Sequence, residues 1–411
     1  MSIVYNGKKA SDMVVNGRHV REAWIDGKKV WPEEVVDWGD WFVVRYQDVY
    51  RVNLYLEIES ETICTVDWGD GTIEQFAKLN STENAISHAY TKNGNYLVKF
   101  KGAIKEARFY KILYADLDNP GILYPNLTEI VHIPTSFQPK YAENLFAGLS
   151  SITTIPFFDM SQCTTAQSIF QGCLSLKEVP LLNTKYVKWW DRAFEYCKSL
   201  ENLPELSLEH LESAQRMFSN CDFIRNVPVF PSSMINHQSG ASYIFYNCRS
   251  LEEVVGRISV ILEYNNPGDM DKTFYNCRKL RRLPDLYVNS IYSAEHCFEN
   301  CFSLESVSIN IYSMRWMRYA FKNCIGLKNV TINLHYVENP FNQIVRIEGL
   351  FENCTSLDTV KIKTFYGPDQ KYYDGIYPNE LGKINPLPAI GPFKNCTALE
   401  YNKIPEKMRW S

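Results

Sequence analysis

The sequence has 411 residues, of which 45% are hydrophobic, and a formal net charge of −4 at pH 7. This length leaves room for roughly two to four domains, and the hydrophobic content indicates packed cores rather than global disorder. The charge balance offers no surplus of lysine and arginine to neutralise phosphates, so nucleic acid is not an expected partner. No run of 18 apolar residues occurs, so membrane insertion is not expected either.

Residues 1–34 carry three turn signals ten residues apart, Asn6-Gly7, Asn16-Gly17 and Asp26-Gly27. Both residues of such pairs tolerate positive φ, so they predict tight hairpins within one β-meander. The meander is too thin to hold a core of its own and is predicted to dock on another surface. The aromatic residues proposed to make that contact are Tyr5, Trp24 and Trp31.

These stretches resemble the short Asn-Gly-Lys-Lys-Val segments at the starts of many phage tail-associated and other virion proteins. The resemblance implies docking to other virion proteins, in several copies of a larger assembly. The first residues, from Met1 to Gly7, lack the apolar core of a signal peptide, which favours folding in the cytoplasm where the chain is made.

Residues 35–103 are predicted to form a β-sandwich, because Val52–Ile58 alternates apolar and polar residues. The segment Trp68-Gly-Asp-Gly71, then His88-Ala-Tyr90, then Gly94-Asn-Tyr-Leu-Val98 resembles the PKD domain, an immunoglobulin-like sandwich. That family implies a spacer or adhesion module. We expect Asp67 and Asp70 to bond to local backbone N–H groups. An acid–base pair with His88 and a calcium site remain alternatives, the second favoured over the first.

Residues 104–145 are predicted to be a transition and an N-terminal cap, and residues 146–411 a solenoid. The motif Phe-x-Asn-Cys-x-Ser-Leu recurs about every 24 residues, with apolar residues six and nine positions after each Phe. Apolar residues four and one positions before the Phe suggest a short helix that carries Phe and Cys. Proline often follows the ninth position, so the strand there must be short. The phenylalanines are Phe146, Phe170, Phe194, Phe218, Phe245, Phe274, Phe298, Phe321, Phe351 and Phe393.

The repeat resembles the BspA-like leucine-rich repeats, which implies an α/β solenoid and a role in surface adhesion or recognition. Nine of the 12 cysteines sit three residues after a repeat Phe. One cysteine at a fixed position in each repeat indicates a small buried residue with a weak S–H donor, because metal sites usually show paired ligands. No cofactor, metal or catalytic residue is expected, and the chain is predicted not to be an enzyme.

Three long steps between repeats predict loops outside the stack, roughly at 257–272, 335–348 and 365–390. The last carries the candidate binding residues, which are Phe365, Tyr366, Tyr372, Tyr373 and Tyr377. Exposed aromatic side chains can stack on sugars or fill a protein pocket. The alternative is that they hold their own loop against the solenoid.

Two functions fit these features. The first is a phage virion structural protein, associated with tail or capsid, that presents the solenoid for attachment to a host-surface glycan or protein. The alternative is a bacterial surface or secreted adhesin. The hairpins in place of a signal sequence favour localisation in the virion over the bacterial cell surface. Affinity from several copies on one particle is part of this expectation.

Overall fold

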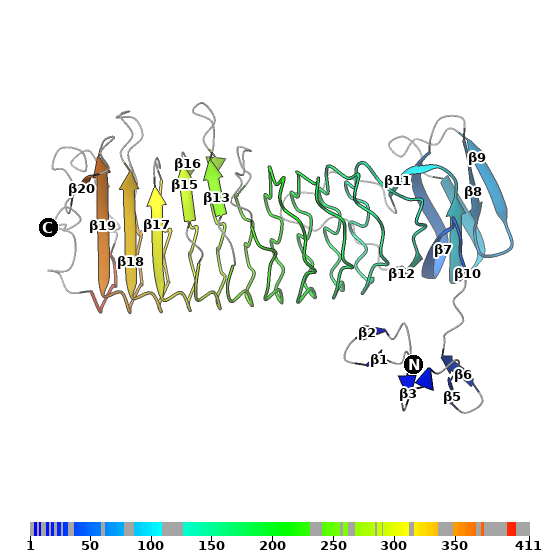
Figure 1. Cartoon of the computed structure of the whole chain (residues 1–411), viewed down its shortest axis with the longest axis horizontal. Coiled ribbons are helices and arrows are strands. Elements are labelled where there is room, and N and C mark those ends of the chain that lie inside the picture. The colour runs from blue at the N-terminus through cyan, green and yellow to red at the C-terminus, as the bar shows by residue number, and fades with distance from the viewer. Residues whose placement is uncertain are drawn as a thin grey trace.

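The fold is described from a computed structural model. It describes residues 4–5, 8–9, 14–15, 18–19, 23–25, 28–31, 37–58, 62–77, 86–108, 126–230, 241–254, 258–261, 268–283, 286–289, 291–311, 316–335, 348–366, 371–373 and 393–399. Figure 1 shows a β-sheet unit at one end of a long stack of coils. None of the described residues forms a helix, and so none could cross a membrane as one.

The three hairpins predicted from the Asx-Gly pairs are confirmed. Each is antiparallel with a two-residue turn, because Tyr5 pairs with Lys8, Val15 with Arg18, and Ile25 with Lys28. The single meander is wrong for the described residues, since each hairpin forms its own two-stranded sheet. Strands this short reach too few neighbours to continue one sheet from hairpin to hairpin. Their strands are β1 (Val4–Tyr5), β2 (Lys8–Lys9), β3 (Val14–Val15), β4 (Arg18–His19), β5 (Ala23–Ile25) and β6 (Lys28–Trp31).

The next unit is an antiparallel sheet of six strands, in the order β11-β7-β10-β8-β9 with β12 also beside β7. Strand β7 is long enough to pair with β12 near its start and with β11 near its end. The sheet therefore extends past the boundary predicted at residue 103. Its immunoglobulin-like class stays a prediction. The strands are β7 (Phe42–Ile58), β8 (Ile63–Asp67), β9 (Ile73–Ala77), β10 (Ile86–Lys101), β11 (Ile104–Arg108) and β12 (Leu127–His132).

Strand β12 joins the sheet unit to the stack. It occupies the strand position of the first coil, and it also pairs antiparallel with β7. Phe137 links the two cores, because its ring lies 4.8 Å from Phe42 and 6.5 Å from Phe158, which in turn lies 5.6 Å from Phe146. The first coil is thus capped by the sheet rather than left exposed to water, as the end of a repeat array requires.

Each coil is built from tight turns, so the helix predicted around Phe and Cys is wrong. In the Phe170 coil, the N–H of Cys173 donates to the carbonyl of Phe170, three residues back, while the N–H of Phe170 donates to Ala193 in the next coil. Residues two before and two after the Phe take positive φ, as in Ser168 and Gly172. A backbone that alternates between right- and left-handed conformations cannot be an α-helix. It nevertheless buries residues at the same positions relative to the Phe as the predicted helix would.

The interior of the stack is a continuous row of stacked phenylalanine rings. Neighbouring rings from Phe146 to Phe393 lie between 5.1 Å and 5.8 Å apart. Asparagines two residues after the Phe form a second row, in which Asn323 Nδ2 donates to Asn300 Oδ1 at 2.8 Å and Asn353 Nδ2 to Asn323 Oδ1 at 2.7 Å. Asparagine suits this position because it tolerates positive φ and can hydrogen-bond along the row.

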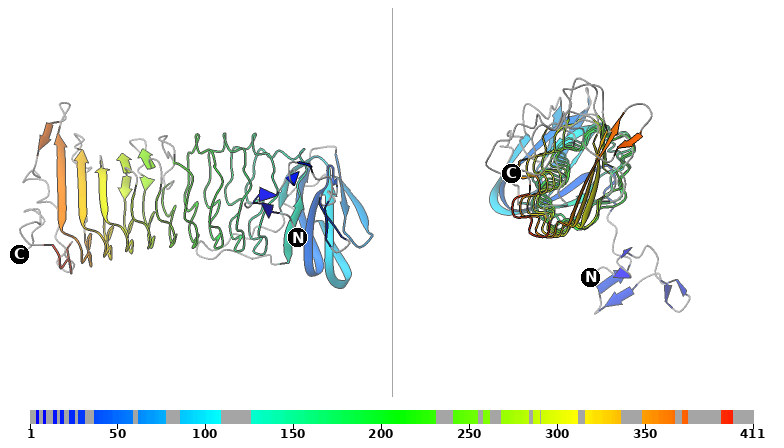
Figure 2. Two further views of the ribbon diagram at one scale, coloured as in Figure 1. Left: turned by 60° about the horizontal axis from the view of Figure 1, so that its bottom comes forward. Right: turned by 90° about the vertical axis from the view of Figure 1, so that its left-hand side faces the viewer.

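A parallel sheet forms only in the later coils, in the order β13-β15-β17-β18-β19, with β20 antiparallel at its edge (Figures 1 and 2). The prolines predicted short strands, whereas the described residues of the coils with Pro156, Pro180, Pro204 and Pro228 form no strand, because proline donates no ladder bond. The strands of this region are β13 (Ile258–Ile261), β14 (Gly268–Asp269), β15 (Leu286–Asn289), β16 (Ile291–Ser293), β17 (Ser306–Ile311), β18 (Asn329–His335), β19 (Thr359–Tyr366) and β20 (Lys371–Tyr373).

Candidate functional site

The predicted aromatic loop begins as a hairpin of the solenoid sheet. Phe365 and Tyr366 end β19, and Tyr372 and Tyr373 lie in β20, which pairs back on it with Phe365 opposite Tyr372. Tyr377 lies outside the described residues. Tyr5, Trp24 and Trp31 fall in β1, β5 and β6. The backbones of four of the five candidate binding residues therefore lie together in this hairpin. Their contact with a partner stays a prediction.

Asp67 and Asp70 shape the turn between β8 and β9. The N–H of Gly69 donates to Asp67 Oδ1 and that of Thr72 to Asp70 Oδ1, each at 2.9 Å, which confirms the backbone role predicted for them. The other oxygens are also engaged, Asp67 Oδ2 by Lys99 at 2.6 Å and Asp70 Oδ2 by His88 at 2.8 Å. The hydrogen bond with His88 lowers the pKa of Asp70.

His88 belongs to an aromatic stack more than to an open cleft. Its ring stacks on buried Trp68 at 5.1 Å and meets Tyr90 edge-on at 4.8 Å. The Tyr90 hydroxyl donates to the Trp68 carbonyl at 2.8 Å. The described hydrogen bonds of Asp67, Asp70 and His88 therefore all hold the turn between β8 and β9 in place. This favours a structural role for these residues over an acid–base pair or a calcium site. No group of three or more metal-ligating side chains occurs in the part of the chain described.

The repeat cysteines are packing residues, as predicted. All are free thiols, and those from Cys173 to Cys354 are fully buried. Each Sγ donates to the carbonyl of the repeat Phe in the preceding coil, for example Cys197 to Phe170 at 3.1 Å and Cys221 to Phe194 at 3.0 Å. Burial raises the pKa of these thiols, as in Cys173, so they are neutral donors and poor nucleophiles.

A different surface gathers exposed aromatic and basic side chains. It lies on the coils of Phe146, Phe170, Phe194 and Phe218, at the residues eight, six and five positions before each Phe. We call it the Lys140–His210 face. Its three rows are Gln138, Gln162, Tyr186 and His210; Lys140, Thr164, Lys188 and Glu212; and Tyr141, Thr165, Trp189 and Ser213.

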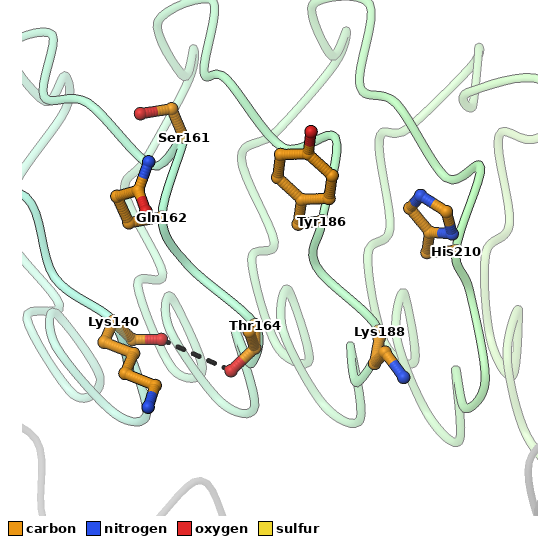
Figure 3. A pocket seen from close by; sticks show the side chains of 7 residues that line it. All are labelled: Lys140, Ser161, Gln162, Thr164, Tyr186, Lys188 and His210. Carbon is orange, nitrogen blue, oxygen red and sulfur yellow. Dashed lines mark hydrogen bonds between the residues drawn. The ribbon is translucent and has the colours of Figure 1, made fainter.

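Backbone bonds between coils fix the spacing of these rows. The N–H of Thr164 donates to the Lys140 carbonyl at 3.0 Å, that of Lys188 to Thr164 at 2.9 Å, and that of Glu212 to Lys188 at 2.8 Å. Hydrogen-bonded neighbours of this kind lie about 4.8 Å apart. Equivalent side chains are therefore presented at nearly constant steps along the stack (Figure 3).

The rings of this face are open to solvent. Tyr141 is 46% exposed, Tyr186 49% and Trp189 38%. Tyr186 and His210 lie on adjacent coils with ring centroids 5.8 Å apart and planes 12° apart. Figure 3 shows both rings turned face-on to the viewer, above the ribbon. A flat ring face held open is suited to stacking against a partner.

The same face is hollowed, and it carries two lysines, one of which is paired with a glutamate. A shallow groove of about 700 Å³ is lined by Lys140, Ser161, Gln162, Thr164, Tyr186, Lys188 and His210. A second hollow, of about 630 Å³, lies where the first coil meets the sheet unit and shares Lys140 with it. Lys140 Nζ lies 5.3 Å from the Tyr141 ring, and Lys188 Nζ pairs with Glu212 Oε1 at 2.7 Å.

The sequence did not single out this face. Its residues lie between the motif positions, and only the coil geometry shows that side chains 24 residues apart are neighbours. One signal was available: aromatic residues recur at fixed distances before the Phe although those positions are not part of the buried motif. Tyr141, Tyr186 and Trp189 could have been found in this way.

Comparison with known proteins now identifies the repeat. The BspA type leucine rich repeat region matches residues 125–252 and 270–365, in six copies, which is more than half of the chain. The chain belongs to this family. The BspA-type match includes every coil that builds the Lys140–His210 face. No curated protein matches the chain.

Solved structures similar to this BspA-type chain include other leucine-rich repeat proteins. One from Bacteroides ovatus is 19% identical, with 58% of this chain and 73% of that protein covered and a TM-score of 0.33. A leucine rich cell surface protein from Faecalibacterium prausnitzii is 16% identical over 72% and 89%, with a TM-score of 0.26. A TLR13–ssRNA13 complex is 14% identical over 64% and 41%, with a TM-score of 0.24. The family assignment rests on the repeat match and not on these structures.

Proposed function

We propose that this BspA-type protein is a non-enzymatic recognition protein of the bacterial surface, and that its solenoid binds a partner through the Lys140–His210 face. The observation that carries the proposal is the division of aromatic residues between two environments. The repeat phenylalanines are buried in the stack, whereas Tyr141, Tyr186 and Trp189 are held open on one side of neighbouring coils. Exposed aromatic residues beside a groove are typical of binding surfaces.

The chemistry of the chain supports binding over catalysis. The thiols of the repeats are buried and neutral, and the Asp70–His88 pair is part of a packed corner. A stack of coils instead offers an extended surface in which each coil adds one more contact. Membership of the BspA-type family and the alternative interpretation of the sequence, a surface adhesin, agree with this proposal.

Alanine variants of the face test the proposal. The full chain is measured by biolayer interferometry against immobilised matrix proteins, mucins and bacterial or host polysaccharides. We expect binding to at least one of them, and Tyr186→Ala and Trp189→Ala to weaken it about tenfold each, since aromatic anchors contribute most of the energy of many interfaces. Leu181→Ala, a similarly exposed apolar residue outside the face, is the matched control and should bind as the parent chain does. Equal losses in all three variants would contradict the proposal.

The virion interpretation is the second candidate, and one observation favours it. The three hairpins predicted from the Asx-Gly pairs, in the stretches that resemble virion segments, are formed. The comparisons give it no support, so the surface interpretation is preferred. Localisation separates the two: surface proteolysis of intact bacteria should remove the native chain, whereas mass spectrometry of purified phage particles would detect it if it were a virion component.

The β19–β20 hairpin is a further contact proposed for the same partner. Replacing Phe365 and Tyr372, which are paired in the backbone register of the hairpin, with alanine should then reduce binding. Unchanged binding in this double variant would leave the Lys140–His210 face as the contact surface and remove the hairpin from the proposal.

A further inference from the structure

On the Lys140–His210 face, two lysines stand on coils that are separated by one coil. In the row six positions before the repeat Phe, Lys140 is followed by Thr164, then Lys188, then Glu212. Adjacent coils lie about 4.8 Å apart. The two lysines are therefore about 10 Å apart along the groove, with an uncharged hydroxyl side chain between them.

The groove also sets the direction in which a bound polymer would lie. The groove crosses the coils, since its lining residues come from four consecutive coils, from Lys140 to His210. A linear polymer lying in it would place one unit on each coil if its units were about 4.8 Å long. An extended chain of hexose sugars has units of about this length.

The stacking surface suits a sugar ring. The rings of Tyr186 and His210, on adjacent coils, are nearly parallel, with their planes 12° apart, and Tyr186 is 49% exposed. The apolar face of a hexose packs on an aromatic ring, while its hydroxyls remain free to bond to side chains at the edge. Gln162 lines the groove beside these rings and can donate and accept such bonds. The hydroxyls of Ser161 and Thr164 donate to Asp159 and to the Lys140 carbonyl, and they can accept.

The charge indicates an anionic polymer. Lys140 has no ion-pair partner among the described residues, and its ammonium group lies beside the Tyr141 ring. Lys188 donates one N–H to Glu212, and a lysine has three. Both side chains therefore have donors for an anionic group, and Lys188 is 44% exposed.

The spacing of the lysines distinguishes between polyanions. A nucleic acid strand carries one charge on every unit, and proteins that bind it match that density with closely spaced cations. Here the row has two cations, Lys140 and Lys188, which stand two coils apart, and its fourth member is Glu212, which pairs with Lys188. The site matches a polymer that carries a negative group on every second unit.

We propose that the groove of the Lys140–His210 face binds a linear polysaccharide of alternating acidic and neutral sugars. The carboxylates of the acidic sugars meet Lys140 and Lys188, and a sugar ring stacks on Tyr186 and His210. This inference rests on the proposed function, because it names the class of partner for the same face.

The test uses the full chain and four probes in isothermal titration calorimetry. Hyaluronan oligosaccharides have a uronic acid on every second sugar, carboxyl-reduced hyaluronan has none, polygalacturonate has one on every sugar, and poly(U) is the nucleic acid probe. We expect hyaluronan to bind at least tenfold more tightly than the other three, and its affinity to fall as salt is raised, since the ion contacts are exposed.

Variants then assign the binding to the groove. Lys140→Gln and Lys188→Gln should each weaken hyaluronan binding about threefold, the size expected of an exposed ion pair, and Tyr186→Ala about tenfold. Lys177→Gln is the control and should have no effect. Lys177 is exposed and lies at least six positions in the sequence from every residue of its own coil that lines the groove. Circular dichroism and thermal unfolding identify any variant that fails to fold, and the conservative variant Lys140→Arg should retain binding.

Four results would overturn the inference. Equal affinity for hyaluronan and its carboxyl-reduced form would show that the acidic groups do not matter. Tighter binding of poly(U) or of polygalacturonate would contradict the alternating pattern. If no probe binds, but Tyr186→Ala still weakens binding of the chain to a protein or neutral glycan, the proposed function stands and this partner class is wrong. If no binding of any kind depends on the face, both fail.

Discussion

The early and late coils of the solenoid share one interior but differ on one side. The coils of Phe170 and Phe194 and the coils of Phe298 and Phe321 have the same phenylalanine stack, the same thiol bond to the preceding coil, and positive φ two residues after the Phe or at the equivalent glycine. Ten residues after the Phe the early coils carry Pro180 and Pro204, whereas the late coils carry Ser308 and Thr331.

The consequence is a strand on one half and none on the other. Ser308 and Thr331 pair within β17 and β18, which form a parallel ladder with β19. The early coils have only isolated bridges, such as Thr165 with Trp189. The turns and the phenylalanine stack therefore hold the coils together in both halves, and the parallel ladder is an addition to them. The Lys140–His210 face lies on the early coils, between five and eight residues before each Phe, at positions outside the buried motif.

The largest effect is expected from the shared stack. Phe194→Ala and Phe321→Ala should each lower the free energy of unfolding by about 4 kcal/mol, because each ring is fully buried between two others and its removal leaves a cavity. Urea unfolding followed by circular dichroism measures both. A loss of unfolding free energy twice as large for one variant as for the other would show that the phenylalanine stack does not support both halves equally.

The ladder itself is tested by exchanging proline and threonine. Thr331→Pro removes an N–H in the middle of β18, between Ser308 and Lys361, and should cost about 3 kcal/mol. Pro180→Thr should cost less than about 1 kcal/mol, through the greater freedom of the unfolded chain alone, because no ladder forms there. A gain of strand signal in the infrared amide band of Pro180→Thr would show that proline alone prevents the early strands.

Much of the interior could be predicted from the sequence. The period, the burial of Phe and Cys and the shortness of the strands follow from one repeated motif. The prediction of a helix failed. The residues four and one before the Phe, the Phe itself and the Cys lie on one face of a helix, but they also lie on one face of successive three-residue turns. Asparagine two residues after the Phe, as in Asn276 and Asn353, was the signal for turns, since it favours positive φ over a helix interior.

The candidate face could not be predicted in the same way. Tyr186 and His210 are neighbours only because the coil closes after 24 residues, and which side chains are open depends on how each coil lies on the next. The junction with the sheet was also hidden, because β12 pairs with β7 across about 80 residues, as in Glu129 with Arg45. Both depend on contacts between distant segments, which local periodicity does not report.

The asparagine row gives a smaller test of the comparison. Asn323→Ala should cost about 2 kcal/mol, since alanine is strained at positive φ and two side-chain bonds are lost. Asn323→Gly should cost about 1 kcal/mol, because only the bonds are lost. Gly172→Ala, at the same position of an early coil, should cost about 1 kcal/mol through strain alone. Equal costs for Asn323→Ala and Asn323→Gly in thermal unfolding would contradict the role of the backbone.

The smallest effect is expected where the two halves meet, at Asp269. Burial, followed by the charge of Asp271, raises the pKa of Asp269 to about 6, and its Oδ1 is buried without a described hydrogen bond. A carboxyl whose pKa is higher in the folded than in the unfolded chain stabilises the fold when protonated, so this contribution is present below the unfolded value and is lost as pH rises towards about 6. Early coils carry neutral residues at the same position, such as Thr165 and Ser213.

Asp269→Asn removes this charge without changing the shape of the side chain. We expect it to raise the free energy of unfolding at pH 7 by about 1 kcal/mol, a modest gain because the side chain is only half-buried, and to have no effect near pH 4. Urea unfolding at both pH values measures the difference. Asp358→Asn, at an exposed carboxylate of a late coil, is the control and should show no such gain. A gain that is equal at pH 4 and pH 7 would mean that Asp269 destabilises the seam through its shape or its unmet hydrogen bond, and not through its charge.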